Sequence, residues 1–171
     1  MAVKGLQEVL KNLQKFGAAA AVEIDKITEE IVINIVADAK INAPKNLGKL
    51  GQSIEKVKIK ESNYKAVAHK EYAAYVEFGT GTKVQVPSEM QKIASQFKNK
   101  KSGSFEAGLR AIKDWCKNKG IDQSAAYPIF ISILNEGIQA RPFLYPAFVK
   151  GRKEYKKDLK DLLKVLTKKY G

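Results

Sequence analysis

Apolar residues recur every three or four positions near the start of the chain. Over residues 3–16 this spacing places five of them on one face of a helix: Leu6, Val9, Leu10, Leu13 and Phe16. The spacing resumes over residues 24–39, so we predict a long N-terminal helix that Gly17 either interrupts or only thins. We expect it to end at Ala43-Pro44, because proline lacks an amide hydrogen and pushes the preceding residue out of the helical region.

Residues 53–60 follow a different pattern, in which apolar and charged residues alternate. Val57 and Ile59 share one side, which predicts a half-buried strand with a lysine-rich outer face. The outer face would carry Lys56, Lys58 and Lys60. Residues 61–63 have the composition of a turn, and residues 64–69 are predicted to return as a second strand. Because an isolated hairpin is only marginally stable, we expect it to pack on the helices or to pair with strands of a neighbouring subunit.

The segment 83–138 is predicted to be a mostly helical insertion. Its helices are expected at about residues 88–97, at 105–117 before Gly120, and from Asp122 or Ser124 to Gly137, with a link at 98–104.

A C-terminal amphipathic helix is predicted from Pro146, a residue that is well tolerated at the first helical position. Its apolar residues recur at helical spacing: Phe148, Tyr155, Leu159, Leu162, Leu163, Leu166 and Tyr170. Together with the segments before it, this helix predicts an α+β fold made of a long N-terminal helix, a small antiparallel sheet, a helical insertion and a C-terminal helix.

The length of 171 residues predicts one domain, 1–171, that can bury a core. No apolar run approaches the roughly 20 residues that a membrane helix needs, and the N-terminus lacks the order of a secretory signal. We therefore expect no membrane partner and a protein that is kept in a cytoplasm.

The net charge of +13 is unevenly distributed along the chain. Residues 1–43 carry −1, residues 44–82 carry +3, residues 83–138 carry +4 and residues 139–171 carry +7. A basic balance of this kind favours contact with a polyanion, whether DNA, RNA or an acidic protein surface. It does not distinguish among them.

The chain offers little for catalysis or metal binding. Cys116 is the only cysteine, and we interpret it as a small buried residue. His69 is the only histidine, and we expect it at a surface or strand edge because no nucleophile lies near it in sequence. We therefore predict no enzyme activity, no metal and no cofactor.

The stretch 72–82 is the densest cluster of aromatic and small residues. Gly79-Thr80-Gly81 lacks the spacing of a phosphate-binding loop, so we interpret it as a structural turn in which the glycines redirect the chain. We expect the aromatic residues of the stretch to be packed: Tyr72, Tyr75 and Phe78. Glu77 lies among apolar residues, and we predict that it pairs with Arg141.

Aromatic residues near lysines leave a second function open. Tyr64, Tyr72 and Tyr75, close to the lysines of the first strand, could form a surface for single-stranded nucleic acid. The motifs of common RNA-binding modules are absent from the sequence. A sequence-independent nucleic-acid-binding module of the host cytoplasm is therefore the alternative interpretation.

Four motifs, in order, resemble the small tail-completion or head–tail joining (neck) proteins of long-tailed double-stranded DNA phages and prophages. The first is Ala43-Pro44 at the end of a long helix. The second is a Gly-x-Leu-x-x-Ser-Ile element, matched by Gly48, Leu50, Ser53 and Ile54. The others are Tyr-Ala-x-Tyr-Val-Glu-Phe-Gly-Thr at 72–80 and Ala-Arg-Pro-Phe-Leu-x-Pro-Ala at 140–147.

The resemblance implies a non-enzymatic virion protein of the tail or neck, present in the host cytoplasm during assembly. It implies a ring of identical subunits around the DNA channel, in contact with other neck or tail proteins. The candidate interface residues are those of the two signatures: Tyr72, Tyr75, Glu77, Phe78, Gly79, Thr80, Gly81, Arg141, Pro142, Phe143 and Pro146. The candidate DNA-facing residues, for contact without sequence specificity, are Lys153, Lys156, Lys157, Lys160 and Lys164.

Overall fold

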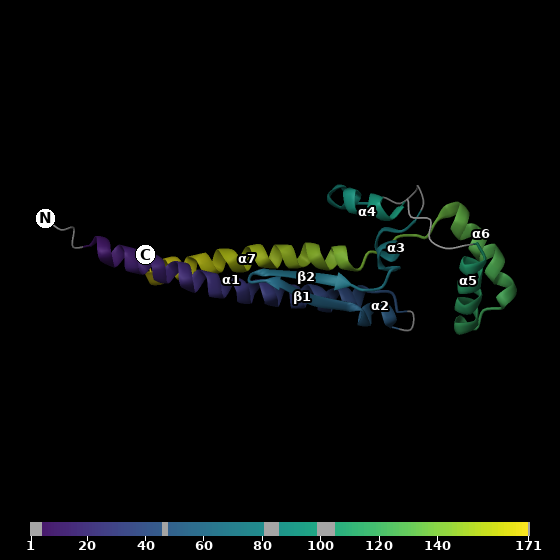
Figure 1. The fold of residues 1–171 in the computed structure, drawn as a ribbon, viewed down its shortest axis with the longest axis horizontal. Coiled ribbons are helices and arrows are strands. Elements are labelled where there is room, and N and C mark those ends of the chain that lie inside the picture. Colours follow the sequence, from purple (N-terminus) through teal and green to yellow (C-terminus); the bar gives the residue numbers. More distant parts are fainter. Residues whose placement is uncertain (1–4, 46–47, 81–85, 99–104, 171) are drawn as a thin grey trace. The chain divides into compact units, whose positions relative to one another are not determined.

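The computed structural model describes residues 5–45, 48–80, 86–98 and 105–170. The chain forms two compact units, one of Met1–Lys70 with Phe143–Gly171 and one of Glu71–Pro142. The first unit contains α1 (Leu6–Asn42), α2 (Lys49–Gln52), β1 (Ile54–Lys60), β2 (Asn63–Ala68) and α7 (Leu144–Tyr170). The second contains α3 (Ala73–Phe78), α4 (Gln91–Lys98), α5 (Phe105–Lys119) and α6 (Ala126–Glu136), with short 3-10 helices at Ser88–Met90 and Gln123–Ala125 (Figure 1).

The predicted α+β class is confirmed, as are the long N-terminal helix, the antiparallel sheet and the C-terminal helix. A single domain with an insertion at 83–138 stays a prediction.

Helix α1 is unbroken from end to end. Gly17 does not interrupt it, although a glycine inside a helix costs about 1 kcal/mol relative to alanine. The helix ends where predicted. Ala43 is extended, with φ −60° and ψ 135°, and its N–H donates to the carbonyl oxygen of Ala39 at 2.9 Å. Pro44 follows directly, so the chain cannot continue as a helix.

Helix α7 lies along α1 and forms the core of the first unit with it (Figure 1). Near the start of α7, Gly151 approaches Ile35 so closely that a Cβ on the glycine would lie 2.5 Å from Ile35 Cγ1. At the end of α7, the ring of Tyr170 meets the ring of Phe16 edge to face, with 6.4 Å between centroids. The two helices are therefore antiparallel. Helix α7 begins at Leu144, two residues before the predicted start.

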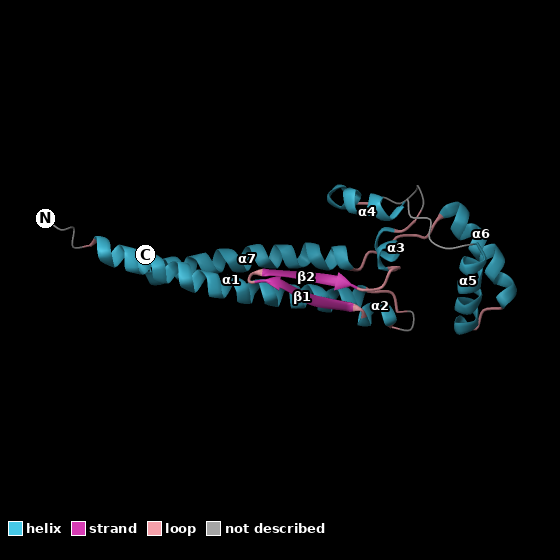
Figure 2. Ribbon diagram, in the orientation of Figure 1, coloured by secondary structure: helices cyan, strands magenta, loops and turns pink. Residues whose placement is uncertain are grey.

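Strands β1 and β2 form a two-stranded antiparallel sheet that lies along α1 (Figure 2). The register pairs Ile54 with Ala68 and Lys58 with Tyr64. At the turn Ser62 has φ 53°, a left-handed conformation that is uncommon for residues with a side chain. Both strands lie within one residue of their predicted bounds.

The prediction that the lysines of β1 form the outer face of the hairpin is wrong. Ile54 is fully buried, and alternation along a strand places Lys56 and Lys58 on the same side as Ile54. Both lysines face acidic residues of α1. The opposite side carries Val57 and Ile59, of which Ile59 is 51% exposed. Choosing the wrong side as buried inverts every side chain of a strand at once.

In the second unit, α5 and α6 pack against each other. Gly108 of α5 lies so close to Phe130 of α6 that a Cβ would be 2.6 Å from the ring. Cys116 is fully buried with a free thiol, as predicted. Gly120 and Gly137 follow α5 and α6 with φ 67° and 83°, which glycine adopts without strain.

The helices predicted inside the segment 83–138 are confirmed as α4, α5 and α6, each within a few residues. The predicted link at 98–104 lies, from residue 99 onwards, outside the described residues.

Candidate assembly surfaces

Two stretches far apart in the sequence lie side by side in the second unit, one after α3 and one after α6. The Thr80 N–H donates to the carbonyl oxygen of Ile138 at 2.9 Å, and the Ile138 N–H donates to the Thr80 hydroxyl at 2.7 Å. The Arg141 N–H donates to the carbonyl oxygen of Val76 in α3 at 2.8 Å. The chain thus departs after residue 80 and returns to the same place at 138–141. The position of Arg141 beside α3 agrees with the prediction that it lies near the stretch 72–82.

Helix α3 occupies most of the stretch 72–82, and the predicted turn begins after it at Gly79 and Thr80. Tyr72 precedes the helix as its N-cap residue, and Gly79 ends it with φ 66° and ψ −178°. That conformation is open to glycine and strained for other residues, so Gly79 redirects the chain as expected. Gly81 lies outside the described residues.

The aromatic residues of this stretch differ in burial. Phe78 is buried and Tyr75 is half-buried, whereas Tyr72 is 43% exposed. The expectation that all three pack inside the subunit is therefore wrong for Tyr72. An exposed tyrosine offers a large rigid apolar surface with a polar tip, which is why tyrosine is enriched where proteins meet.

The predicted partners Glu77 and Arg141 lie near each other in the chain's path but differ in exposure. Glu77 is 7% exposed, whereas Arg141 is exposed, and its main chain is held beside α3 through Val76. Their ion pair stays a prediction. Of the remaining residues of the second signature, Pro142 is exposed and Phe143 is buried.

The candidate Pro146 lies in the first turn of α7, exposed. Proline is tolerated there because the first N–H groups of a helix have no partner within it.

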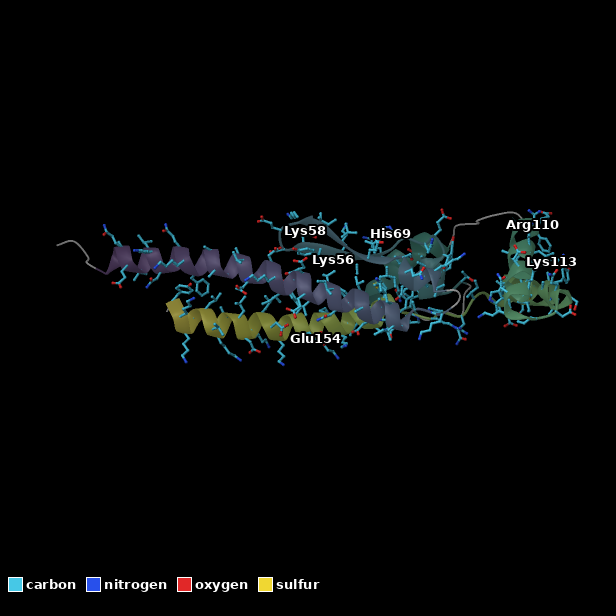
Figure 3. The ribbon with its side chains drawn as sticks, turned by 90° about the horizontal axis from the view of Figure 1, so that it is seen from below. Lys56, Lys58, His69, Arg110, Lys113 and Glu154 are labelled. Atoms are coloured by element: carbon cyan, nitrogen blue, oxygen red, sulfur yellow. The ribbon has the colours of Figure 1, made fainter. Side chains whose placement is uncertain are left out.

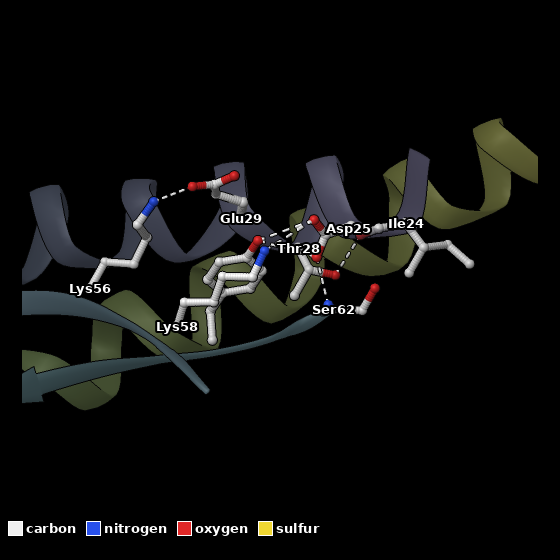
Figure 4. A network of polar contacts seen from close by, with 8 residues as sticks. Ile24, Asp25, Thr28, Glu29, Lys56, Lys58 and Ser62 are labelled. Carbon is white, nitrogen blue, oxygen red and sulfur yellow. Dashed lines mark hydrogen bonds and ion pairs between the residues drawn. The ribbon is translucent and has the colours of Figure 1, made fainter. Parts of the chain in front are cut away.

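A polar network joins the hairpin to α1 (Figure 4). Lys56 Nζ donates to a carboxylate oxygen of Glu29. One turn away, Asp25 accepts a hydrogen bond from the main-chain N–H of Ser62 at 2.5 Å and contacts the Tyr64 hydroxyl at 3.1 Å. Lys58 Nζ lies 3.7 Å from the other oxygen of Asp25. Asp25 and Glu29 lie four residues apart on one side of α1. They pair with Lys58 and Lys56 of β1, respectively.

The network shifts the pKa values of Asp25 and Lys58. The Ser62 N–H holds the pKa of Asp25 below its ordinary value, partial desolvation acts in the opposite direction, and the Tyr64 hydroxyl and Lys58 add to the lowering. The pKa of Lys58 is raised by its contact with the Tyr64 hydroxyl and by the negative charge of Asp25. Both shifts favour the charged forms, so they support the observed pairing.

The five candidate DNA-facing lysines, Lys153, Lys156, Lys157, Lys160 and Lys164, are all exposed. Helical spacing places them opposite the residues of α7 that pack on α1, such as Gly151 and Leu166. Figure 3 shows nitrogen-tipped side chains projecting from α7 on the side away from α1. Lys164 also contacts Asp161 at 2.9 Å. We call this surface the lysine stripe.

His69 lies just beyond the end of β2, as expected for an edge residue (Figure 3). Its Nε2 is 3.6 Å from Glu55, and both side chains are more than half exposed. Within the described ranges, no cluster of three or more His, Cys, Asp or Glu residues could hold a metal ion. No helix in the same ranges is long and apolar enough to cross a membrane.

The inward lysines were missed by sequence reasoning although two signals pointed to them. Ile54 alternates in phase with Lys56 and Lys58, and Asp25 and Glu29 are spaced to share one face of α1. Taken together, these positions predict charge pairing beneath the hairpin. Considering Val57 and Ile59 alone favoured the wrong side.

The described residues offer three extended surfaces: the antiparallel pair of α1 and α7, the hairpin of β1 and β2, and the lysine stripe of α7. Residues 7–79 match the family model described as "Bacteriophage HK97-gp10, putative tail-component". Over these residues, which include most of α1, the hairpin and α3, the chain is similar to this family of phage tail components. The match covers less than half of the chain and ends before the helices α4 to α6. Neither the curated proteins nor the solved structures contain a match.

Proposed function

We propose that this protein is a structural, non-enzymatic component of the phage virion that completes the tail or joins it to the head. The observation that carries the proposal is the family match over residues 7–79. In this role the protein acts as a ring of identical subunits around the DNA channel, together with other neck or tail proteins.

A ring requires a contact between two different surfaces of neighbouring subunits, and the described residues offer several open ones. The outer side of the hairpin carries Val57, Ile59 and Val67, and Ile59 is more than half exposed. Tyr72, Arg141 and Pro142 are exposed in the second unit. These two groups are the surfaces that we propose for subunit contacts.

The lysine stripe supports a contact with packaged DNA. Helix α7 carries nine Lys and Arg residues against three Asp and Glu residues, and the lysines of the stripe lie on the side of α7 opposite α1, whereas Lys150 pairs with Asp38 of α1 at 2.7 Å. Phosphate contacts of this kind are independent of sequence and weaken steeply with salt, because bound counterions are released on association. The same stripe favours the second candidate function, a nucleic-acid-binding module of the host cytoplasm.

Electron microscopy with mass measurement of the purified protein separates the two functions. We expect discrete rings whose formation is impaired by the combined substitution Tyr72→Ala and Arg141→Ala. Val22→Ala, an exposed position on α1, is the matched control. A protein that stays monomeric at all concentrations and shifts nucleic acid would instead support the cytoplasmic module.

A phage that lacks the gene gives a second test of the tail role. We expect cells infected by it to accumulate heads and tails that are not joined or not completed. Normal yields of infectious particles would contradict the proposal.

DNA contact is tested by the salt dependence of binding to a short duplex. Replacing Lys153, Lys157, Lys160 and Lys164 by Gln should lower affinity by roughly tenfold or more at low salt and reduce the salt slope, because each phosphate contact contributes to it. The control replaces four lysines outside the stripe, Lys40, Lys65, Lys113 and Lys117. If both sets of substitutions lowered the affinity for the duplex equally, binding would depend on the net charge of the protein and not on the lysine stripe.

A further inference from the structure

The N-terminal part of α1 presents a stripe of bare apolar side chains. Leu6, Val9, Leu10 and Leu13 are exposed by 51% to 64% although they share one face of the helix. A continuous apolar stripe on a helix is normally the side on which another helix packs. We call these four residues the α1 tip.

The α1 tip continues the face of α1 on which α7 packs. Helical spacing places Leu6 and Leu13 on the same side of α1 as Ile31 and Ile35. The last two residues lie against Gly151 of α7. Helix α7 reaches the beginning of this face only at Phe16, where its Tyr170 makes the ring contact described above. The described residues leave the same face open over the α1 tip.

The edges of the α1 tip are uncharged. Gln7, Asn12 and Gln14 flank the stripe, whereas Glu8 and Lys11 lie on the opposite side of the helix. Lys15 also lies on that opposite side, so residues 5–15 carry a net charge of only +1 and none of it borders the stripe. Two copies can therefore meet here without the repulsion between like charges that their basic surfaces would cause.

The stripe is also its own complement when two copies are antiparallel. With the two-fold axis between Val9 and Leu10, Leu6 of each copy faces Leu13 of the other, and Val9 faces Leu10. The partner helix then runs in the direction that α7 takes on the same face, and the opposed helix dipoles favour this orientation.

We infer that the α1 tip is a self-association site, at which the α1 tip of a second copy of this chain packs antiparallel. The contact is small, so we expect a dimer that dissociates in the micromolar range. The contact is two-fold and therefore differs from the head-to-tail contact that closes a ring. It can fail while the proposed tail role stands, and the reverse also holds.

Sedimentation equilibrium of the full chain tests the site. We expect the double substitution Leu10→Gln and Leu13→Gln to raise the dissociation constant by about tenfold or more, since it removes half of the apolar contact while keeping helix propensity. The matched control is Val22→Gln with Ile33→Gln, two exposed apolar residues on the opposite side of α1. A mass that is identical for wild type and the tip variant at every concentration would overturn the inference.

Because the contact is apolar, it should persist at high salt, unlike binding of a polyanion. Dissociation by salt alone would also overturn the inference.

Disulfide trapping tests the direction of the partner helix. Leu6 and Leu13 are about 10 Å apart along the helix, beyond the roughly 7 Å between Cα atoms that a disulfide spans. Antiparallel packing therefore predicts that Leu6→Cys and Leu13→Cys cross-link when mixed but not when each is oxidised alone. Cross-linking of Leu6→Cys with itself would indicate parallel packing and contradict the inference. The wild type, whose Cys116 is buried, is the control.

Discussion

Two stretches of α1 share one apolar face and have opposite surroundings. From Phe16 to Ala39 the face is covered by α7, and Ile31, Ile35 and Ala39 are buried. Over the α1 tip the same face is bare. The difference shows that burial of this face depends on a partner helix and not on α1 itself. A helix gains most of its stability from such packing. Substitutions that distinguish the two stretches therefore test how the protein is held together.

The largest expected effect comes from truncating the covered face. Ile35→Ala should lower the free energy of unfolding by about 3 kcal/mol, because it opens a cavity against Gly151. Leu13→Ala, at the same face of the α1 tip, should change it by less than about 0.5 kcal/mol. Chemical denaturation, at concentrations where the chain is monomeric, measures both values. Equal losses would mean that the α1 tip is covered in solution by the chain itself.

Enlarging the closest helix contact is expected to have a somewhat smaller effect. In Gly151→Leu a side chain enters the space of Ile35, whose Cγ1 would lie only 2.5 Å from a Cβ at position 151. We expect a loss of about 2 kcal/mol from overpacking, even though leucine is the better helix former. Thermal unfolding followed by circular dichroism provides the measurement.

The matched control is Gly17→Leu. No atom lies within 4 Å of a Cβ at Gly17, so the substitution should leave the unfolding temperature unchanged or raise it. If both glycine variants behaved alike, the close packing of α7 on α1 would be contradicted.

The smallest effect concerns the hairpin, which also lies along the covered part of α1. The pKa of Asp25 is lowered in the folded state, so its charge stabilises the fold above the ordinary pKa of about 4. That stabilisation is lost as the pH falls through the lowered pKa. We expect Asp25→Asn to reduce the acid dependence of unfolding and to speed hydrogen exchange of the Ser62 amide. Carboxyl titration by NMR would contradict the pairing if Asp25 titrated at its ordinary pKa. Glu30→Gln, on an exposed residue of α1, is the control.

Much of the fold was predictable because its signals are local. Pro44 ends α1, Gly120 and Gly137 end α5 and α6, and alternation marks the two strands. Each of these depends on the backbone preferences of a few neighbouring residues. The family resemblance was carried in the same way, by short motifs that can be compared without knowing what they contact.

The candidate site was predicted only in part. The return of the chain to α3 was expected, and Arg141 lies there, but Ala73–Phe78 proved to be a helix, preceded by an exposed Tyr72. Helix and turn were hard to separate in six residues that contain both aromatic and small side chains. Whether a tyrosine is covered depends on residues that are distant in sequence.

Most of the helices and both strands, the basic charge and the similarity of residues 7–79 to a family of phage tail components followed from the sequence alone. Only the tertiary structure decided which side of each element is covered. It turned Lys56 and Lys58 towards Asp25 and Glu29, and it placed α7 over Ile35 while leaving Leu6 to Leu13 open. The physical reason is that periodicity defines the two sides of an element, whereas burial is a property of what packs against it.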